Sequence, residues 1–227
     1  MKKEKEVVKK KRFNFVKFLI VLLLLYVLGF YTYKILVSKI NNIFITNNKI
    51  LTDQEIIDSA GLRDYPSFLL TPKIKIKKQL LKNKLIKDVN IKKKIGKIVE
   101  IEVIENEPLF IYKNEVILDN GEKLDNVNYI LPSLINNVSP EILKKLINKY
   151  KDLNQEIKSM ISEIKYDPND IDKERFLLTM NDGNYVYITL YKLISLNEYI
   201  KIVDTIGNKK GTLYLDSGNY FEVFKNS

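Results

Sequence analysis

The sequence predicts an α+β protein with a single membrane-spanning helix, a small β-α-α-β-β domain, and a strand-rich domain that contains two helices. Three features predict this class: an uncharged apolar run near the amino terminus, helix and strand patterns that follow one another in the middle, and short β-branched or aromatic runs between turn residues later on. The expected boundaries are a basic stub at 1–17, a transmembrane helix at 18–37, a first domain at 38–107 and a second domain at 108–227.

The apolar run covers residues 18–33 and contains no charged side chain. Its length falls short of the roughly 20 residues that cross the hydrocarbon core, but apolar neighbours extend it on both sides, and Lys17 and Lys34 can reach the interface through their long side chains. Eight Lys and Arg residues precede the run, whereas a comparable stretch after it holds only three Lys. This asymmetry predicts a cytoplasmic amino terminus and a bulk that lies outside the cell membrane.

A cleaved signal peptide has the same charged-then-apolar order and is the alternative interpretation of this segment. A cleavage site needs small residues just after the apolar core, and the only alanine of the chain is Ala60. The outer end instead carries Phe30, Tyr31 and Tyr33, which are typical of membrane interfaces. We therefore expect the anchor to be retained.

The composition excludes several function classes. No cysteine and no histidine occur among the 227 residues, so a disulfide framework, a thiolate metal site and every Ser-His or Cys-His catalytic pair are excluded. The chain also lacks a Gly-rich phosphate loop and a cluster of metal ligands. We expect no enzyme activity, no cofactor and no metal site.

The net charge of +10 is concentrated in the amino-terminal stub and at residues 73–97. Outside the cell, a basic stretch favours anionic lipid headgroups, anionic wall polymers or an acidic protein over nucleic acid. A solvated face in a Lys-rich chain accounts for the same charges without any ligand, and both interpretations stay open. The candidate contacts with an anionic surface are Lys92, Lys93 and Lys94.

The first domain begins with a predicted strand at 40–46, which is apolar and β-branched and ends at the turn residues Asn47 and Asn48. A helix follows, with Thr52 as its cap, Glu55 as the second half of a capping box, and Gly61 at its end.

A second helix starts after Thr71 and Pro72, and two strands at 86–95 and 97–105 complete the domain. Gly96 and Lys97 form the turn between these two strands. The strand pattern also explains the glutamates nearby as the solvent-facing side of a strand rather than as catalytic carboxylates: Glu100, Glu102, Glu105 and Glu107.

The second domain is predicted to alternate short strands with two helices. One helix begins at Ser139 and Pro140 and has apolar residues at spacings of three and four, and the other runs from 192 to 206. The expected strands lie in the segments LFIYKNEVILDNGEKLD, SEIKYD, FLLTM, YVYITL, GTLYL and NYFEVF.

Taken together, these segments resemble the FtsQ/DivIB family of cell-division proteins over nearly all of residues 18–224. The first domain is similar to that family's POTRA domain in IFITNNKILTDQEIIDSAGL and in NKLIKDVNIKKKIGKIVEIEVIENEP, which includes a Glu-x-x-Pro exit at Glu105 and Pro108. The second domain is similar in LDNGEKL, YILPSL and GTLYLDSGNYF. Two departures are Asn47, where the family usually has glycine, and Gly96, where it usually has a proline in the hairpin.

The resemblance implies a non-enzymatic scaffold of the divisome, the envelope assembly that builds the division septum. Family members bind two single-pass coiled-coil membrane proteins, FtsL and FtsB/DivIC, and act through them on the septal transpeptidase, a penicillin-binding protein, and on septal peptidoglycan synthesis. The resemblance therefore implies a single-pass protein of the cell membrane at the septum, with a cytoplasmic amino terminus and no nucleic-acid partner.

The implied binding surface is the last strand, at 219–224, because an edge strand can accept a strand from a partner. The sequence does not decide which N–H groups of this strand face outward. Its aromatic residues could also be part of the hydrophobic core instead of contacting a partner. Two other functions stay open, an anchored binder of anionic wall polymer and a POTRA-type component of polypeptide transport. The expected partner contacts are Tyr214, Asp216, Ser217, Gly218, Tyr220, Phe221 and Val223.

Overall fold

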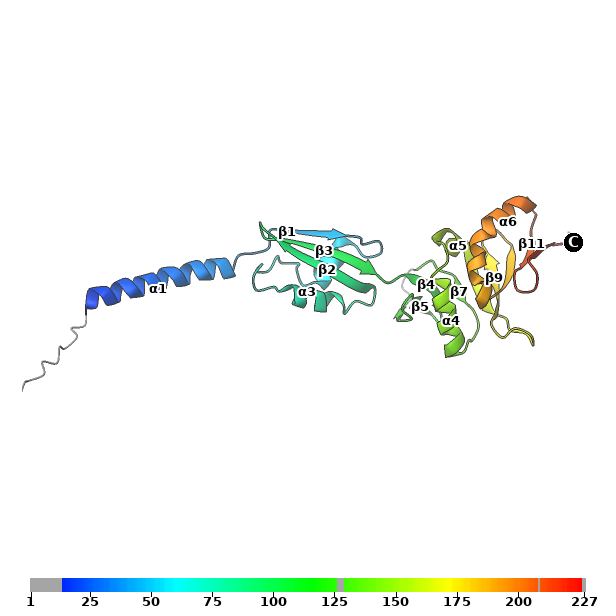
Figure 1. The fold of residues 1–227 in the computed structure, drawn as a ribbon, viewed down its shortest axis with the longest axis horizontal. Coiled ribbons are helices and arrows are strands. Elements are labelled where there is room, and N and C mark those ends of the chain that lie inside the picture. Colours follow the sequence, from blue (N-terminus) through cyan, green and yellow to red (C-terminus); the bar gives the residue numbers. More distant parts are fainter. Residues whose placement is uncertain (1–13, 126–128, 208, 226–227) are drawn as a thin grey trace, which may run out of the picture. The chain divides into compact units, whose positions relative to one another are not determined.

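The structure, a computed structural model, describes residues 14–125, 129–207 and 209–225. Most of the predicted basic stub therefore lies outside the described residues. The described chain forms two compact units, each with its own core (Figure 1). Beyond the first helix, the N-terminal unit comprises 37–46, 52–80 and 90–102, and the C-terminal unit comprises 47–51, 81–89, 103–125, 129–207 and 209–225.

A helix, α1, is observed at Phe15–Leu36, where the sequence predicts a transmembrane helix at 18–37. The Asn14 side chain caps it by accepting a hydrogen bond from the backbone N–H of Lys17. No residue of α1 is buried, although nearly all of its side chains are apolar. Among the described residues, α1 is the one helix long and apolar enough to cross a membrane.

A three-stranded sheet with two helices follows α1 in the predicted order. The helix α2 has the expected capping box, in which Thr52 accepts from the N–H of Glu55 and the Glu55 carboxylate accepts from the N–H of Thr52. The turn between the last two strands has positive φ at both Gly96 and Lys97, which is the conformation of a tight hairpin. The elements are β1 (Asn42–Thr46), α2 (Asp53–Ser59), α3 (Lys73–Leu80), β2 (Ile86–Lys94) and β3 (Ile98–Glu105).

The strands of this sheet lie in the order β1-β3-β2, and β1 is parallel to β3. Because β2 and β3 form a hairpin, β2 runs in the opposite direction to the other two strands. The core of the N-terminal unit is built from one face of each element, which is why the apolar residues repeat with period two in the strands. Its buried members include Ile40, Ile56, Leu62, Ile76, Val99 and Ile101.

The remaining strands form one nine-stranded sheet in the order β12-β11-β10-β9-β8-β7-β4-β5-β6. Neighbouring strands are antiparallel except for the pairs β10–β11, β7–β8 and β4–β7. The strands are β4 (Pro108–Tyr112), β5 (Glu115–Leu118), β6 (Lys123–Asp125), β7 (Ser133–Leu134), β8 (Ile161–Tyr166), β9 (Arg175–Met180), β10 (Tyr185–Thr189), β11 (Gly211–Tyr214) and β12 (Tyr220–Val223).

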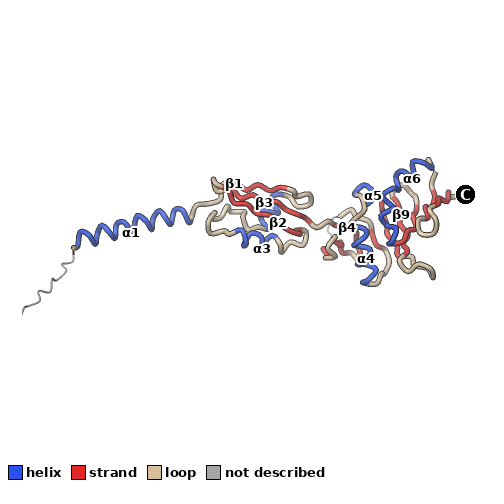
Figure 2. Tube along the Cα trace, in the orientation of Figure 1, coloured by secondary structure: helices blue, strands red, loops and turns tan. Residues whose placement is uncertain are grey.

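Helices α4, α5 and α6 gather around this sheet (Figure 2). They bury one of its faces, to which Phe176, Leu178 and Val186 contribute, in a common hydrophobic core with Leu146 and Tyr150 of α4. The opposite face is the more open one along β9, β10 and β11, where Leu177, Tyr187 and Thr212 are half-buried. The helices are α4 (Pro140–Tyr150), α5 (Gln155–Met160), the 3₁₀ helix η1 (Leu190–Glu198) and α6 (Tyr199–Ile206).

Two helices of this unit differ from the sequence-based expectation. The single helix expected at 192–206 is a 3₁₀ segment that continues into α6. Its buried residues Leu190, Leu193 and Leu196 recur every third position, which matches the three residues per turn of a 3₁₀ helix. The short helix α5 was not predicted, because its six residues contain too few apolar positions to show a helical period.

The glutamates of the β3 region have structural partners. Glu100 pairs with Lys94 at 2.5 Å, as expected for a solvent-facing strand residue. Glu105 instead accepts hydrogen bonds from three successive backbone N–H groups, those of Lys49, Ile50 and Leu51, at 2.8 to 2.9 Å. Its carboxylate thus satisfies the backbone of the turn that follows Asn47, which explains why a glutamate stands at this position.

Candidate functional site

The candidate site is the edge of the nine-stranded sheet formed by β11, the turn after it, and β12. Strand β11 lies parallel to β10, with Tyr187 opposite Tyr214, and β12 returns antiparallel to β11, with Tyr214 opposite Tyr220. No described strand lies beyond β12, so its outer backbone groups form an open edge.

The hydrogen bonds of β12 decide which backbone groups face that open edge. The N–H of Phe224 donates to the carbonyl of Lys210 at 2.9 Å, and these two residues continue the register in which Glu222 lies opposite Thr212. Because inward and outward groups alternate in an antiparallel pair, Tyr220 and Glu222 also point their N–H groups toward β11. The N–H and carbonyl groups of Phe221 and Val223 therefore point outward.

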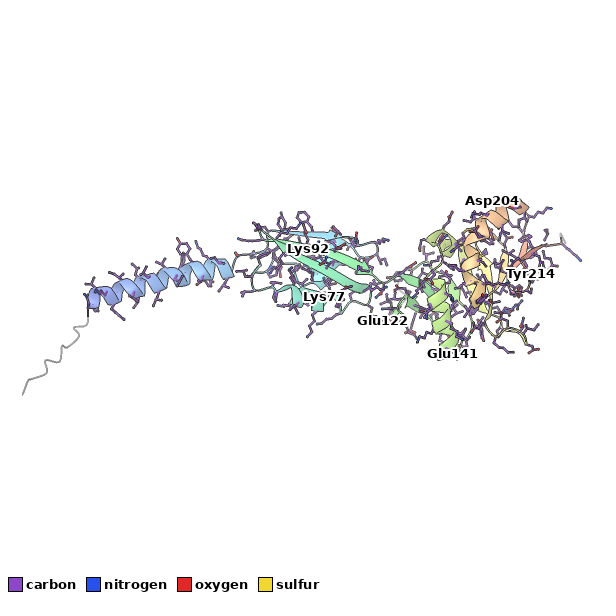
Figure 3. The ribbon with its side chains drawn as sticks, viewed as in Figure 1. Lys77, Lys92, Glu122, Glu141, Asp204 and Tyr214 are labelled. Atoms are coloured by element: carbon purple, nitrogen blue, oxygen red, sulfur yellow. The ribbon has the colours of Figure 1, made fainter. Side chains whose placement is uncertain are left out.

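A row of stacked side chains crosses the open face of the sheet and ends at this edge. The guanidinium of Arg175 lies 3.7 Å from the centre of the Tyr187 ring, the Tyr187 and Tyr214 ring centres are 5.4 Å apart, and those of Tyr214 and Tyr220 are 4.6 Å apart. The four residues come from four adjacent strands, and Tyr214 is labelled in Figure 3. Since each aromatic pair contributes about 0.5–1.5 kcal/mol, the row holds β11 and β12 against the rest of the sheet.

Asp216 anchors the turn between β11 and β12. Its carboxylate accepts from Nε of Arg175 at 2.7 Å and from the backbone N–H of Ser217 at 2.8 Å. Burial acts to raise the pKa of Asp216, but the hydrogen bonds from Arg175 and Ser217 outweigh it and hold that pKa below its ordinary value of 3.8. Arg175 is also paired with Asp167 at 2.6 Å, so one guanidinium joins two loops and the aromatic row.

Replacing Asp216 by asparagine is expected to destabilise this edge by about 1–3 kcal/mol at neutral pH, because Arg175 loses a charged partner in a mostly buried position. The folded state lowers the pKa of Asp216, so the contribution is complete above the ordinary value and is lost as the pH falls below 3.8. The difference in melting temperature between wild type and D216N should therefore shrink in acid. The control is Asp170→Asn, since Asp170 is fully exposed; an equal effect of both variants would refute this role.

The structure brings together all seven residues expected to contact a partner. Tyr214 and Tyr220 belong to the stacked row, and Asp216, Ser217 and Gly218 form the turn that joins their strands. Phe221 points to the other face, where it packs against the hydrophobic core, so it has a structural role as well. Val223 is 44% exposed.

The three lysines expected at an anionic surface have different surroundings. Lys92 is exposed (Figure 3), and Lys94 pairs with Glu100. Lys93 is engaged inside the N-terminal unit: its ammonium donates to the carbonyls of Phe68 and Thr71 and lies 4.2 Å from the centre of the Phe68 ring. Burial, together with the nearby charge of Lys73, lowers the pKa of Lys93.

Sequence reasoning missed Arg175 and Tyr187. Neither lies near the last strand in the sequence, and only the sheet order brings them to it. One signal was available: Arg175 is one of three arginines in a chain with 38 Lys and Arg residues, and arginine is preferred where a planar group must stack and pair at once. Among the described residues, no three His, Cys, Asp or Glu side chains are grouped to hold a metal ion.

Comparison with known proteins places these features in a family. A family model described as "POTRA domain, FtsQ-type" matches residues 38–106. The chain is similar to cell division protein DivIB of Bacillus subtilis (strain 168), with 30% identity over 199 residues that cover 83% of this chain and 75% of that protein. It is also similar to DivIB of Brevibacillus brevis, with 29% identity over 218 residues that cover 88% of this chain and 83% of that protein.

Among solved structures, the major extracytoplasmic domain of DivIB from Geobacillus stearothermophilus aligns with 44% of this chain and 92% of its own length, at 21% identity and a TM-score of 0.39. That likeness is too distant to support a conclusion by itself. The sequence relatives, which extend over most of both chains, confirm the resemblance drawn from the motifs and support a role in cell division. This chain belongs to the DivIB family of cell division proteins.

Proposed function

We propose that the protein is a non-enzymatic scaffold of the septum-building assembly and that it binds FtsL-like and FtsB/DivIC-like coiled-coil membrane proteins. Through these partners it acts on the septal transpeptidase and on peptidoglycan synthesis. It has one membrane-spanning segment, α1, with the amino terminus in the cytoplasm and both compact units outside. The chain is then divided into a cytoplasmic stub at 1–17, a transmembrane helix at 18–37, a first domain at 38–107 and a second domain at 108–227.

The open edge of β12 is the observation that carries this proposal. Phe221 and Val223 each present a backbone donor and an acceptor on the same side of the strand, which is what an added strand requires. The edge is also held rigidly, because the row from Arg175 to Tyr220 and the Asp216 turn fix β11 and β12 before any partner arrives. A pre-ordered edge reduces the ordering entropy that binding must overcome.

Co-purification of the full chain in detergent with the two coiled-coil partners tests the scaffold function. We expect a ternary complex in which backbone amides of Phe221 and Val223 become protected from hydrogen exchange. Failure to form the complex would contradict the proposal. Retention on wall polymer without either partner would favour the anchored polymer binder, and binding of unfolded polypeptide would favour the transport component.

The proposed topology predicts a difference in chemical labelling, because the chain contains no cysteine of its own. Single cysteines at Val8 and at the exposed Ser159 should react differently with a membrane-impermeant maleimide on intact cells. Only Ser159→Cys should be labelled, and both variants should be labelled after lysis. Labelling of Val8→Cys on intact cells would reverse the orientation, and a mature protein that starts near residue 38 would show a cleaved signal.

A further inference from the structure

One end of the three-stranded sheet lies next to the end of α1. Strand β1 begins at Asn42, shortly after α1 ends at Leu36, and β3 is parallel to β1, so β3 begins at this same end. The turn between β2 and β3 must therefore lie there too. Two hydrogen bonds agree with this placement: Asn41 donates from its backbone N–H to the carbonyl of Lys97 at 3.0 Å and from its side chain to the carbonyl of Gly96 at 2.9 Å.

A second loop, at 65–71, is tied to the same end. The hydroxyl of Ser67 donates to the carbonyl of Leu36, the last residue of α1. The N–H of Phe68 donates to the carbonyl of Ser38 at 2.9 Å, and the N–H of Ile40 donates to that of Pro66 at 3.0 Å. The buried contacts of Lys93 hold the loop against the end of β2 as well, so the loop cannot move away from the end of α1 without breaking several hydrogen bonds.

These two loops expose large apolar side chains. Ile95 is 100% exposed, Leu70 is 62% exposed and Leu69 is 49% exposed. A single exposed apolar residue needs no explanation, but three on two adjoining loops at one end of a unit form a local apolar tip. Lysines flank Ile95 on the β2–β3 hairpin, namely Lys92, Lys97 and Lys94, the last of which pairs with Glu100. Apolar side chains surrounded by lysines are the composition of surfaces that bind the interface of an anionic membrane.

The length of α1 sets the depth at which this tip lies. Its 22 residues extend over about 33 Å, slightly more than the roughly 30 Å hydrocarbon core, so Leu36 lies at the boundary between acyl chains and headgroups. A loop that is hydrogen-bonded to Leu36 lies in or beside the headgroup layer, which extends about 5–8 Å beyond the core. Leucine and isoleucine side chains projecting from that loop and from the adjoining turn can reach the boundary.

We propose that the apolar tip formed by Ile95, Leu69 and Leu70 inserts into the interfacial layer of the membrane that α1 spans, with the flanking lysines on anionic headgroups. The N-terminal unit is then fixed against the lipid surface at three points on two loops, in addition to its covalent link to α1. This proposal rests on α1 being a membrane anchor, which is part of the proposed function. It assigns a role to Lys92 that does not require Lys93 to leave its internal contacts.

Site-specific fluorescence in the full-length chain tests the inference. Single cysteines at Ile95 and at Leu70 are labelled with an environment-sensitive dye, and the protein is reconstituted at low density into bilayers that contain phosphatidylglycerol and lipids with brominated acyl chains. Leu24→Cys, in the middle of α1, reports on the anchor itself. Gln54→Cys is the control within the unit. Gln54 lies in α2, which begins after the end of β1 that is farther from α1. Ile171→Cys, 96% exposed, is matched to Ile95 in residue type and exposure.

We expect the dyes at Leu24, Ile95 and Leu70 to emit at shorter wavelength and to be quenched by the brominated lipids, and those at Gln54 and Ile171 to do neither. Quenching at Leu24 but not at Ile95 or Leu70 would overturn the inference and leave the anchor intact. Absence of quenching at Leu24 would overturn the anchor and the inference with it. Equal quenching at Ile171 would show that the dye itself partitions into lipid, which would also refute a specific tip.

Because the bilayer contains no other protein, the result separates lipid from a protein partner as the occupant of the tip. A tip that stays unquenched in lipid alone but becomes shielded when the coiled-coil partners are added would contradict the inference and assign these side chains to a protein interface. Partner binding at β12 is measured in the same samples. It should be unaffected in Ile95→Ser and Leu70→Ser, so that failure of the tip and failure of the scaffold function are distinguished.

Discussion

Replacement of Val223 by proline is expected to leave the fold nearly as stable as in the wild type while weakening the binding of the FtsB/DivIC-like partner at least about tenfold. The N–H of Val223 points to the open edge, so its loss breaks no bond within the sheet. An added strand would lose a donor and leave one of its own carbonyls without a partner, which costs about 1–3 kcal/mol, or roughly tenfold to a hundredfold in affinity.

The neighbouring residue is the matched control. Glu222 is also exposed, but its N–H points toward Thr212 on β11, so Glu222→Pro should lower the melting temperature of the full chain and weaken binding only through that loss of order. Val223→Ala and Glu222→Ala correct for the side chains, and the two measurements are thermal unfolding in detergent and partner affinity. If affinity falls only in those variants whose stability falls, strand addition at this edge is wrong and the partner docks elsewhere.

The sequence predicted most elements of the fold because each is marked by local chemistry. The capping box at Thr52 and Glu55, the helix start at Ser139 and Pro140, and the positive φ of Gly96 depend on residues within a few positions of one another. The 3₁₀ segment before α6 was not predicted, because its helix type is set by how three leucines pack against the rest of the core.

The candidate site was predicted less completely, for a similar reason. Its residues on β11 and β12 lie close together in the sequence, and motif resemblance located them. The residues that hold them, Arg175 and Tyr187, lie far away in the sequence. They reach the site only through the strand order β12-β11-β10-β9, which no local pattern encodes. The direction of each N–H in β12 also depends on its pairing with β11, and a shift of one residue in that register would reverse it.

The register of β12 on β11 depends on Gly211, so we expect a substitution at Gly211 to have a large effect on the stability of this edge. Gly211 is buried at the start of β11, where the Phe221 ring and the carbonyl of Glu222 on β12 lie against its backbone. A Cβ built on Gly211 would overlap that carbonyl and would lie 2.7 Å from the nearest atom of the Phe221 ring. Because the carbonyl is backbone and the ring packs against the core, neither can move without displacing β12.

Gly211→Ala is therefore expected to destabilise the C-terminal edge by about 1–3 kcal/mol and to detach β12 from β11, although alanine is otherwise better tolerated than glycine in a strand. Hydrogen exchange in the full chain provides the measurement. The amides of Tyr220, Glu222 and Phe224, which point toward β11, should lose protection. The amides of β8 and β9 should keep it. Partner binding should fall together with that protection, unlike in Val223→Pro. Gly218→Ala is the control for amide protection alone, since its added Cβ would meet no backbone atom and would come no closer than 3.3 Å to the Tyr220 ring. If these three amides stay as protected in Gly211→Ala as in the wild type, the close approach of β12 to Gly211 does not hold this edge in place.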